Sequence, residues 1–255
     1  MKNTPLSFNV LRKWHSKLRA KNIVTYTLQH PEKGLIEYTD RKRYLWILSV
    51  FLPLAPFLGI FLYRQTESQW ALALPLALVY LVIPGLDALF GADPSNPPEE
   101  IVPQLEQDRY YRWLTWATVP LHFLTLIAVA WFTATHDLTY LSVVIMAVTA
   151  GAFSGLGINT AHELGHKKTR IEKFLAKAAL TIPAYGHFCV EHNRGHHRFV
   201  STPDDPASAR MGESIYRFTA REIPGACKRG WQVESERLAR LGKGTWSLPN
   251  DILQS

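Results

Sequence analysis

The chain has 255 residues, a formal net charge of +7 and 47% hydrophobic residues, a length that allows one or two domains with a real core. Its two cysteines, Cys189 and Cys227, form no CxxC pair, which argues against a thiolate zinc site or a thioredoxin-like motif. No nucleic-acid-binding module is visible, so the modest positive charge gives no support for nucleic-acid binding.

Residues 1–43 are expected to form a cytoplasmic basic arm. They hold ten Lys and Arg residues against three acids, which is typical of a segment lying on an anionic membrane surface. The first long apolar run begins near Tyr44, too late in the chain for the n-region and h-region of a signal peptide, so none is expected.

Residues 44–160 are expected to hold four transmembrane helices. The predicted spans, in chain order, are residues 44–63, 70–90, 113–132 and 138–158. Each is long enough as a helix to cross the roughly 30 Å of hydrocarbon in a bilayer. Two short polar loops, residues 64–69 and 133–137, join the spans into two helical hairpins. Pro53 and Pro56 in the first span are tolerated more readily in a membrane helix than in a soluble one.

The distribution of Lys and Arg predicts the orientation in the inner (cytoplasmic) membrane. The loop at 64–69 carries one Arg, the loop at 133–137 carries none, and the N-terminal arm and the stretch after the fourth span carry many. The rule that positive loops stay inside places the N-terminus and everything after His162 in the cytoplasm. Residues 171–190 are expected as a helix at the membrane surface, with a fifth span as the alternative. The predicted fold is therefore all-α: a multi-span transmembrane protein with cytoplasmic histidine-rich helices in residues 161–255.

Five histidines follow the fourth span in two motifs. HELGHK contributes His162 and His166, and EHNRGHH contributes His192, His196 and His197. Residues four apart share one face of a helix, and two such pairs on neighbouring helices can enclose a metal. Imidazole is a good ligand for iron, copper, zinc and nickel, so these five side chains are predicted metal ligands. The alternative is a set of surface histidines at an interface.

The first motif also matches HExxH, the signature of zinc metalloproteases, in which the glutamate acts as general base. The second motif holds more imidazoles than a single catalytic zinc needs. Two histidine clusters beside apolar helices fit two metals better than one. They favour non-haem iron that activates dioxygen for an apolar substrate.

The residues around both motifs resemble a known family. NTAHELGHKKT and YGHFCVEHNRGHHRFV, followed by STPDDPASARMGESIYRFTAREIPGA, are similar to the integral-membrane alkane 1-monooxygenases, or alkane hydroxylases. GLDALFGADPSNPPEE after the second span is similar to that family as well. Fatty-acid desaturases have related histidine boxes with different spacing.

The resemblance implies a diiron centre that hydroxylates the terminal carbon of medium-chain n-alkanes with O2, giving 1-alcohols. Rubredoxin would supply the electrons after its own reduction by an NADH-dependent rubredoxin reductase. All five histidines would be iron ligands, and no separate catalytic residue is predicted. Glu163, Glu191 and His187 are candidates for orienting the ligand imidazoles. Asp204 and Asp205 are interpreted as turn residues.

The family continues beyond this chain, with two further spans, an N-Y-x-E-H-Y-G segment and a third histidine box of the H-S-x-H-H kind. The chain therefore resembles the first two-thirds of an alkane hydroxylase, with residues 161–255 forming an incomplete catalytic domain. We expect that it does not assemble a competent diiron site alone. Three alternatives remain: a related diiron hydroxylase or desaturase of another apolar substrate, a membrane zinc protease, and an inactive membrane fragment.

Overall fold

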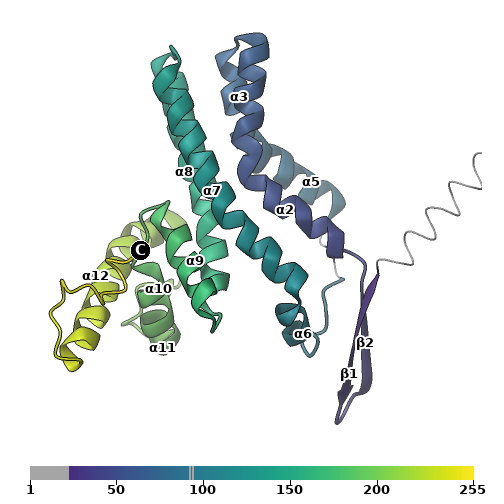
Figure 1. The fold of residues 1–255 in the computed structure, drawn as a ribbon, viewed down its shortest axis with the longest axis vertical. Coiled ribbons are helices and arrows are strands. Elements are labelled where there is room, and N and C mark those ends of the chain that lie inside the picture. Colours follow the sequence, from purple (N-terminus) through teal and green to yellow (C-terminus); the bar gives the residue numbers. More distant parts are fainter. Residues whose placement is uncertain (1–22, 92, 94) are drawn as a thin grey trace, which may run out of the picture. The chain divides into compact units, whose positions relative to one another are not determined.

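The computed structural model describes residues 23–91, 93 and 95–255, which are mostly helical (Figure 1). Residues 1–22, about half of the predicted basic arm, lie outside the described residues. The chain divides into two compact units. The first runs to Ser49 and includes Asp87–Leu114, and the second comprises Val50–Leu86 and Thr115–Ser255.

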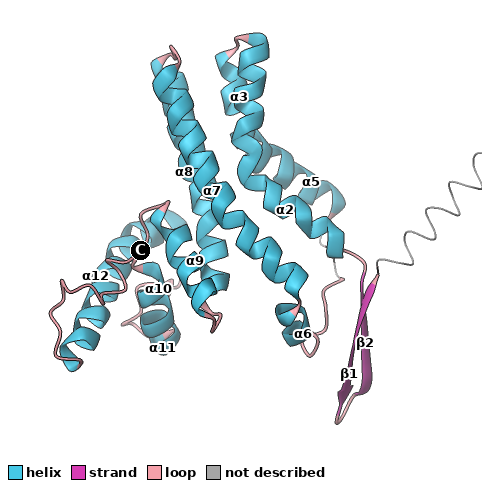
Figure 2. Cartoon of the chain, in the orientation of Figure 1, coloured by secondary structure: helices cyan, strands magenta, loops and turns pink. Residues whose placement is uncertain are grey.

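A β-hairpin in the first unit is a departure from the all-α prediction. β1 (Val24–His30) pairs antiparallel with β2 (Gly34–Asp40), drawn in magenta in Figure 2. Exposed and half-buried side chains alternate along both strands, which is the two-residue period of a strand. Gly34 has a φ of +73°, a conformation that glycine adopts without steric cost, at the end of the turn.

Asp108 fastens this hairpin to the helices of its own unit, which include α6 (Val102–Gln107). Arg43 donates to both carboxylate oxygens of Asp108 over 2.6 and 2.9 Å, and Tyr26 of β1 donates to one of them over 2.5 Å. The bond from Arg43 holds the pKa of Asp108 well below its usual range. At the end of β2, Asp40 is buried and accepts a bond of 2.5 Å from Tyr111.

Within the described residues, four helices are long and apolar enough to cross a membrane: Arg43–Thr66, Gln69–Phe90, Arg109–Thr135 and Tyr140–Gly165. The prediction of a multi-span helical membrane protein is thus confirmed, with spans that extend a few residues beyond the predicted ones at most of their ends. The third and fourth spans are the single helices α7 (Arg109–Thr135) and α8 (Tyr140–Gly165).

The first two spans are broken into shorter pieces. In chain order these are η1 (Arg43–Trp46), α2 (Ile47–Phe51), η2 (Leu52–Leu54), α3 (Ala55–Thr66), η3 (Gln69–Ala73), α4 (Leu74–Ala77), η4 (Leu78–Val82) and α5 (Ile83–Phe90). Pro53, Pro56 and Pro75 lie at the first positions of three pieces, because proline lacks the N–H that an interior position would donate. Thr125 of α7 donates to the carbonyl of Pro53 over 2.8 Å, which satisfies one backbone group in this broken region.

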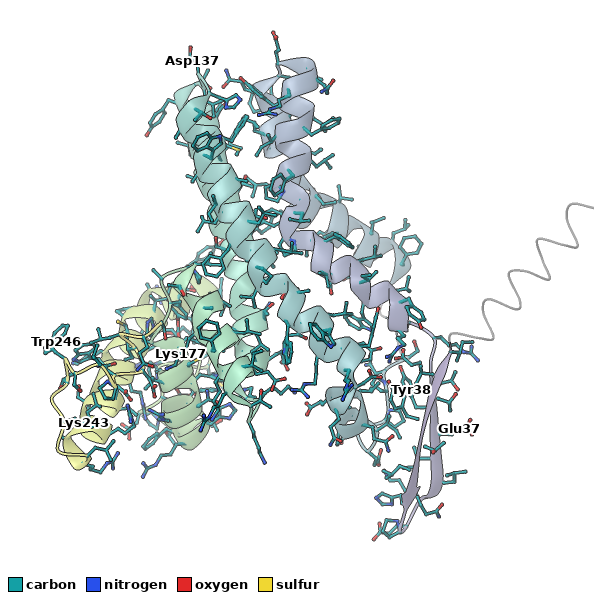
Figure 3. All side chains as sticks on the ribbon, viewed as in Figure 1. Glu37, Tyr38, Asp137, Lys177, Lys243 and Trp246 are labelled. Atoms are coloured by element: carbon teal, nitrogen blue, oxygen red, sulfur yellow. The ribbon has the colours of Figure 1, made fainter. Side chains whose placement is uncertain are left out.

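Side chains from three spans pack together near the turn that joins α7 and α8. Leu72, Val129, Phe132 and Met146 form one buried apolar cluster. Asp137, labelled in Figure 3, lies at this turn. Beside it, Gln69 accepts bonds of 2.9 and 2.7 Å from the backbone N–H and hydroxyl of Thr139, the residue that caps α8. The start of the second span is thereby tied to the start of the fourth.

The remaining helices follow α8 in the chain (Figure 1). They are α9 (Arg170–Thr181), α10 (Phe188–Glu191), the π-helical turn η5 (His192–His196), α11 (His197–Phe199) and α12 (Ile215–Arg240). Helix α9 packs on α8, and α12 packs on α10. A second buried cluster includes Ala161 and Leu164 of α8 and Ala176 and Leu180 of α9. At 12 residues, α9 is about 18 Å long, too short for a fifth span.

A buried ion cluster joins α12 to the second histidine motif. Glu234 of α12 is fully buried and accepts bonds from Arg194 over 2.8 Å, from Arg237 over 2.5 and 2.8 Å, and from the backbone N–H of Asp251 over 2.7 Å. Burial alone would raise the pKa of Glu234, but these donors lower it overall. Asp251 in turn accepts from Lys177 of α9, which is labelled in Figure 3.

Candidate metal centre

Five imidazoles from the two predicted motifs form one group in the second unit. Ligand nitrogens of His162, His166 and His192 all lie within 4.8 Å of one another. His197 joins them through its Nε2 atom, 3.1 Å from Nε2 of His192, and the ring of His196 stacks on His192 with centroids 5.4 Å apart. The two motifs therefore meet in a single arrangement, the imidazole cluster, rather than forming two separate ones.

The first histidine box, His162 and His166, lies at the end of α8. His162 occupies the last turn and His166 caps the helix, with ring centroids 4.7 Å apart as the spacing of four predicts. The chain then reverses into α9, whose first turn is capped by Thr169 accepting from the N–H of Glu172 over 3.3 Å. Packing of α9 on α8 fixes the place of this box.

The second histidine box, residues 192–197, depends on a local departure from α-helical geometry. In an α-helix, side chains five residues apart point about 140° apart. Here the N–H of His197 bonds to the carbonyl of His192, the i→i+5 pattern of a π-helix. This wider turn brings His197 onto the same face as His192 while His196 still contacts it. Gly195 lies close to Glu191 in this turn, and a Cβ atom there would lie 2.8 Å from Oε1 of Glu191, so that side chain would have to shift.

Burial favours the neutral form of two rings in the imidazole cluster. Burial, together with the neighbouring imidazoles, lowers the pKa of His192 to about 4 and also lowers that of His166. Neutral imidazole keeps one nitrogen lone pair free, which is the form that binds a metal. Neutral nitrogen donors within reach of one another fit a divalent transition metal such as iron or zinc.

The three predicted orienting residues occupy different surroundings. Glu163 has a side chain that is 64% exposed, with Oε1 3.9 Å from Nδ1 of His162. His187 is buried against Tyr185, and within the described part of the chain its Nε2 has no hydrogen-bond partner. Glu191 is buried against Gly195, and this burial raises its pKa.

Asp205 is the residue of this site that the sequence analysis missed. Its interpretation as a turn residue is confirmed, since its carboxylate accepts from the backbone N–H of Ala207 over 3.0 Å, but the carboxylate is also buried and lies 2.9 Å from Nδ1 of His196. Asp204 beside it is exposed, as a turn residue should be. The local sequence, two adjacent aspartates before a proline, contains nothing that distinguishes one from the other.

A basic groove of about 800 Å³ lies beside the second histidine box. Its cationic lining residues are Arg194, Arg198, Arg221, Lys228, Arg229, Arg237 and Arg240. Asp204 and Glu236 are the acids of the lining, so the groove presents positive charge to an approaching molecule.

Comparison with known proteins places this site in a family. A family model described as fatty acid desaturase matches residues 138–251, a range that contains both histidine boxes. Alkane 1-monooxygenase of Pseudomonas putida is 51% identical over 218 residues, which are 86% of this chain and 54% of that protein. Alkane 1-monooxygenase 1 of Alcanivorax borkumensis is 52% identical over 217 residues, which are 85% of this chain and 54% of that protein. The chain belongs to the alkane 1-monooxygenase family.

The chain spans about half the length of the curated relatives it matches. A less similar relative shows the same partial coverage. Alkane 1-monooxygenase of Acinetobacter baylyi is 38% identical over 222 residues, which are 84% of this chain and 53% of that protein. Family membership confirms the resemblance drawn from the histidine motifs.

Proposed function

We propose that the protein containing this chain is an alkane 1-monooxygenase, which uses O2 to hydroxylate the terminal carbon of medium-chain n-alkanes to 1-alcohols. The observation that carries the proposal is the imidazole cluster, five histidine rings gathered where two motifs meet at the end of a membrane span. The relatives named as alkane 1-monooxygenases support the same activity.

The proposed ligands of two non-haem iron ions are His162, His166, His192, His196 and His197, together with side chains from other parts of the protein. When bound, iron supplies the activation of O2: one oxygen atom enters the C–H bond, and the other leaves as water with two electrons and two protons. The protein chain contributes a prearranged donor set. Nε2 of His192 and Nε2 of His197 lie 3.1 Å apart, a distance at which two neutral rings share at most one proton.

The four spans supply the route for an apolar substrate. An n-alkane has no polar group, so apolar side chains of the spans must recognise it by shape and contact. Because α8 is both a span and the carrier of the first histidine box, the proposed route runs along this helix to the imidazole cluster. We propose residues 44–160 as the membrane domain and residues 161–255 as part of the catalytic domain.

The distribution of positive charge supports an inner-membrane protein with its N-terminus and histidine boxes in the cytoplasm. Electrons then come from rubredoxin, which NADH reduces through rubredoxin reductase. The basic groove beside the second histidine box is complementary in charge to an acidic electron-transfer protein. Reduction that weakens as salt is raised would support docking there, and reduction insensitive to salt would contradict it.

The test is to purify the protein expressed from its complete reading frame and supply it with n-octane, 18O2 and reduced rubredoxin. We expect labelled 1-octanol, loss of activity on iron chelation, and recovery with iron but not with zinc. Recovery with zinc and cleavage of peptides without O2 would instead establish a protease. If the reaction gives a dehydrogenated product and water but no labelled alcohol, the protein is a desaturase. Residues 1–255 expressed alone should give no octanol.

A further inference from the structure

Residues 201–208, within the loop between α11 and α12, place a buried carboxylate behind the second histidine box. Asp205 is 2% exposed, and its two carboxylate oxygens accept from different donors. Oδ1 accepts from the backbone N–H of Ala207 over 3.0 Å. Oδ2 accepts from the hydroxyl of Ser208 over 2.5 Å and lies 2.9 Å from Nδ1 of His196. A carboxylate buried to this degree is costly unless these bonds compensate it.

Helix α12 fixes the position of this loop. Arg221 donates to the carbonyl of Pro206 over 2.9 Å and to that of Ser208 over 3.1 Å, while Glu213 holds the other side of the guanidinium. Gly225 lies so close to the loop that a Cβ atom there would meet Pro206 at 2.8 Å. The carboxylate of Asp205 is thus held by donors within the loop, and the loop itself is held by α12.

The contact between Asp205 and His196 decides which ring nitrogen is free. The carboxylate of Asp205 already accepts from the N–H of Ala207 at Oδ1 and from the hydroxyl of Ser208 at Oδ2, so it acts as the acceptor in this contact as well. Nδ1 of His196 must therefore carry the proton, which leaves the Nε2 lone pair free. The ring lies against His192 at 5.4 Å and His197 at 5.7 Å, inside the imidazole cluster.

We propose that Asp205 is a positioning residue, which holds His196 in the tautomer protonated at Nδ1 so that Nε2 is its metal-binding nitrogen. The inference rests on the proposed metal centre. It assigns to this chain's own loop the role that carboxylates commonly have beside ligand histidines, namely fixing ring orientation and raising ligand basicity. In the first box the only comparable ion pair within the described chain, Glu163 with His162, is 3.9 Å long and exposed.

The arrangement predicts an unusual result for the isosteric variant Asp205→Asn. Because Ala207 N–H needs an acceptor, the amide oxygen takes the place of Oδ1 and the amide NH2 takes the place of Oδ2. That NH2 then faces Nδ1 of His196 and donates to it, which forces the proton onto Nε2. Asp205→Asn is therefore expected to weaken metal binding at least as much as Asp205→Ala. A purely structural role predicts the opposite order, since the isosteric side chain fills the space that alanine leaves empty.

The experiment titrates Co(II) into the metal-free protein from its complete reading frame, monitoring the visible absorption of the bound ion. Asp204→Asn is the matched control, because it makes the same change in the neighbouring exposed residue. We expect Asp205→Asn to weaken Co(II) binding about 10–100-fold and Asp204→Asn to change it less than about twofold. Circular dichroism identical to wild type establishes that Asp205→Asn is folded.

Folded Asp205→Asn that binds Co(II) within about twofold of the Asp204→Asn control would overturn the inference, whatever happens to Asp205→Ala. A milder effect for Asn than for Ala, with both folded, would also overturn it. If the wild-type protein binds neither Co(II) nor iron, the proposed metal centre fails instead, which distinguishes the two claims.

Discussion

The two histidine boxes reach the same cluster by different structural means. The first box lies on a regular helix, where the spacing of four alone puts His162 beside His166, and its nearest carboxylate, Glu163, is largely exposed. The second box needs a π-helical turn, a glycine in close contact with Glu191, and a buried carboxylate behind His196.

This difference shows which contacts fix the positions of the histidine rings in the site. A straight helix sets the separation of two rings four residues apart by its own geometry. A turn that presents three rings within six residues has no such rule, so other elements must hold it. Helix α12 does this through Glu234, which binds Arg194 within the turn, and through Arg221, which binds the loop of Asp205. The following changes test this contrast.

Removing the central ring should have the largest effect. His192 contacts rings of both boxes, since its centroid lies 4.5 Å from His162 and 4.5 Å from His197. We expect His192→Ala to weaken Co(II) binding more than about 100-fold, beyond the 10–100-fold typical of residues that only orient a ligand. His136→Ala serves as the control, because His136 lies in the turn before α8, at the other end of that helix from the cluster. Equal affinities for the two variants would show that the cluster does not bind the metal.

Adding one methyl group to each box should destabilise the second box more than the first. At Gly195 a Cβ atom would lie 2.8 Å from Oε1 of Glu191 and 3.2 Å from Nε of Arg229, so Gly195→Ala should cost about 1–3 kcal/mol of stability and weaken metal binding. At Gly165, beside the first box, the nearest atom is Sγ of Cys189 at an ordinary 3.5 Å, and Gly165→Ala should be tolerated. Thermal unfolding measures the loss of stability in both variants. Equal losses would contradict the difference proposed between the two boxes.

Acid should weaken the support of the second box. Hydrogen bonds lower the pKa values of Glu234 and Asp251 in the folded protein, so their stabilisation is complete above about pH 5. It is lost as the pH falls through the ordinary carboxyl range towards those lowered values. Glu234→Gln should cost about 1–2 kcal/mol at pH 7 and reduce the slope of stability against pH below 5.

The matched control for this change is Glu236→Gln, on the same helix, whose partner is the exposed Gln232 at 3.2 Å. Thermal unfolding of the metal-free protein between pH 7 and pH 4 measures both variants. If the two variants lose the same stability with the same slope, the buried ion cluster does not support the turn.

The smallest effect is expected at Glu163. Its exposed carboxylate, 3.9 Å from His162, should matter little, and Glu163→Gln should change Co(II) affinity less than about twofold. The same variant separates two reaction classes, because a HExxH protease would need this glutamate as its general base. Complete loss of the protein's activity with unchanged metal content would favour that alternative.

The sequence was sufficient where one local property determines the structure. Long apolar runs without charge determine the four spans, and a spacing of four determines the meeting of His162 with His166. The structure also brings together the five histidines that the motifs selected, while their binding of iron stays a prediction. The β-hairpin was missed although VTYTLQH alternates as a strand should, because the arm was interpreted from its charge alone.

Two features of the second box could not be predicted from the local sequence. The spacing in EHNRGHH fits an α-helix as well as a π-helical turn, and the contacts that hold the observed turn, such as that of Arg194 with Glu234 of α12, lie outside the motif. The loop of Asp205 is held by Arg221 and Gly225, which follow Asp205 by 16 and 20 residues. Interactions between distant elements decide both, and a motif does not contain them.

Because α8 is one uninterrupted helix from Tyr140 to Gly165, it links the metal site mechanically to the bilayer. Each residue adds about 1.5 Å of rise and 100° of rotation. A bilayer thinner or thicker than the span should therefore tilt or shift α8. His162, in the last turn of α8, moves with the helix, while the second box stays with α12. The thickness of the bilayer should therefore change the distance between the two boxes. Reconstitution in short- and long-chain lipids should in turn change the affinity for metal.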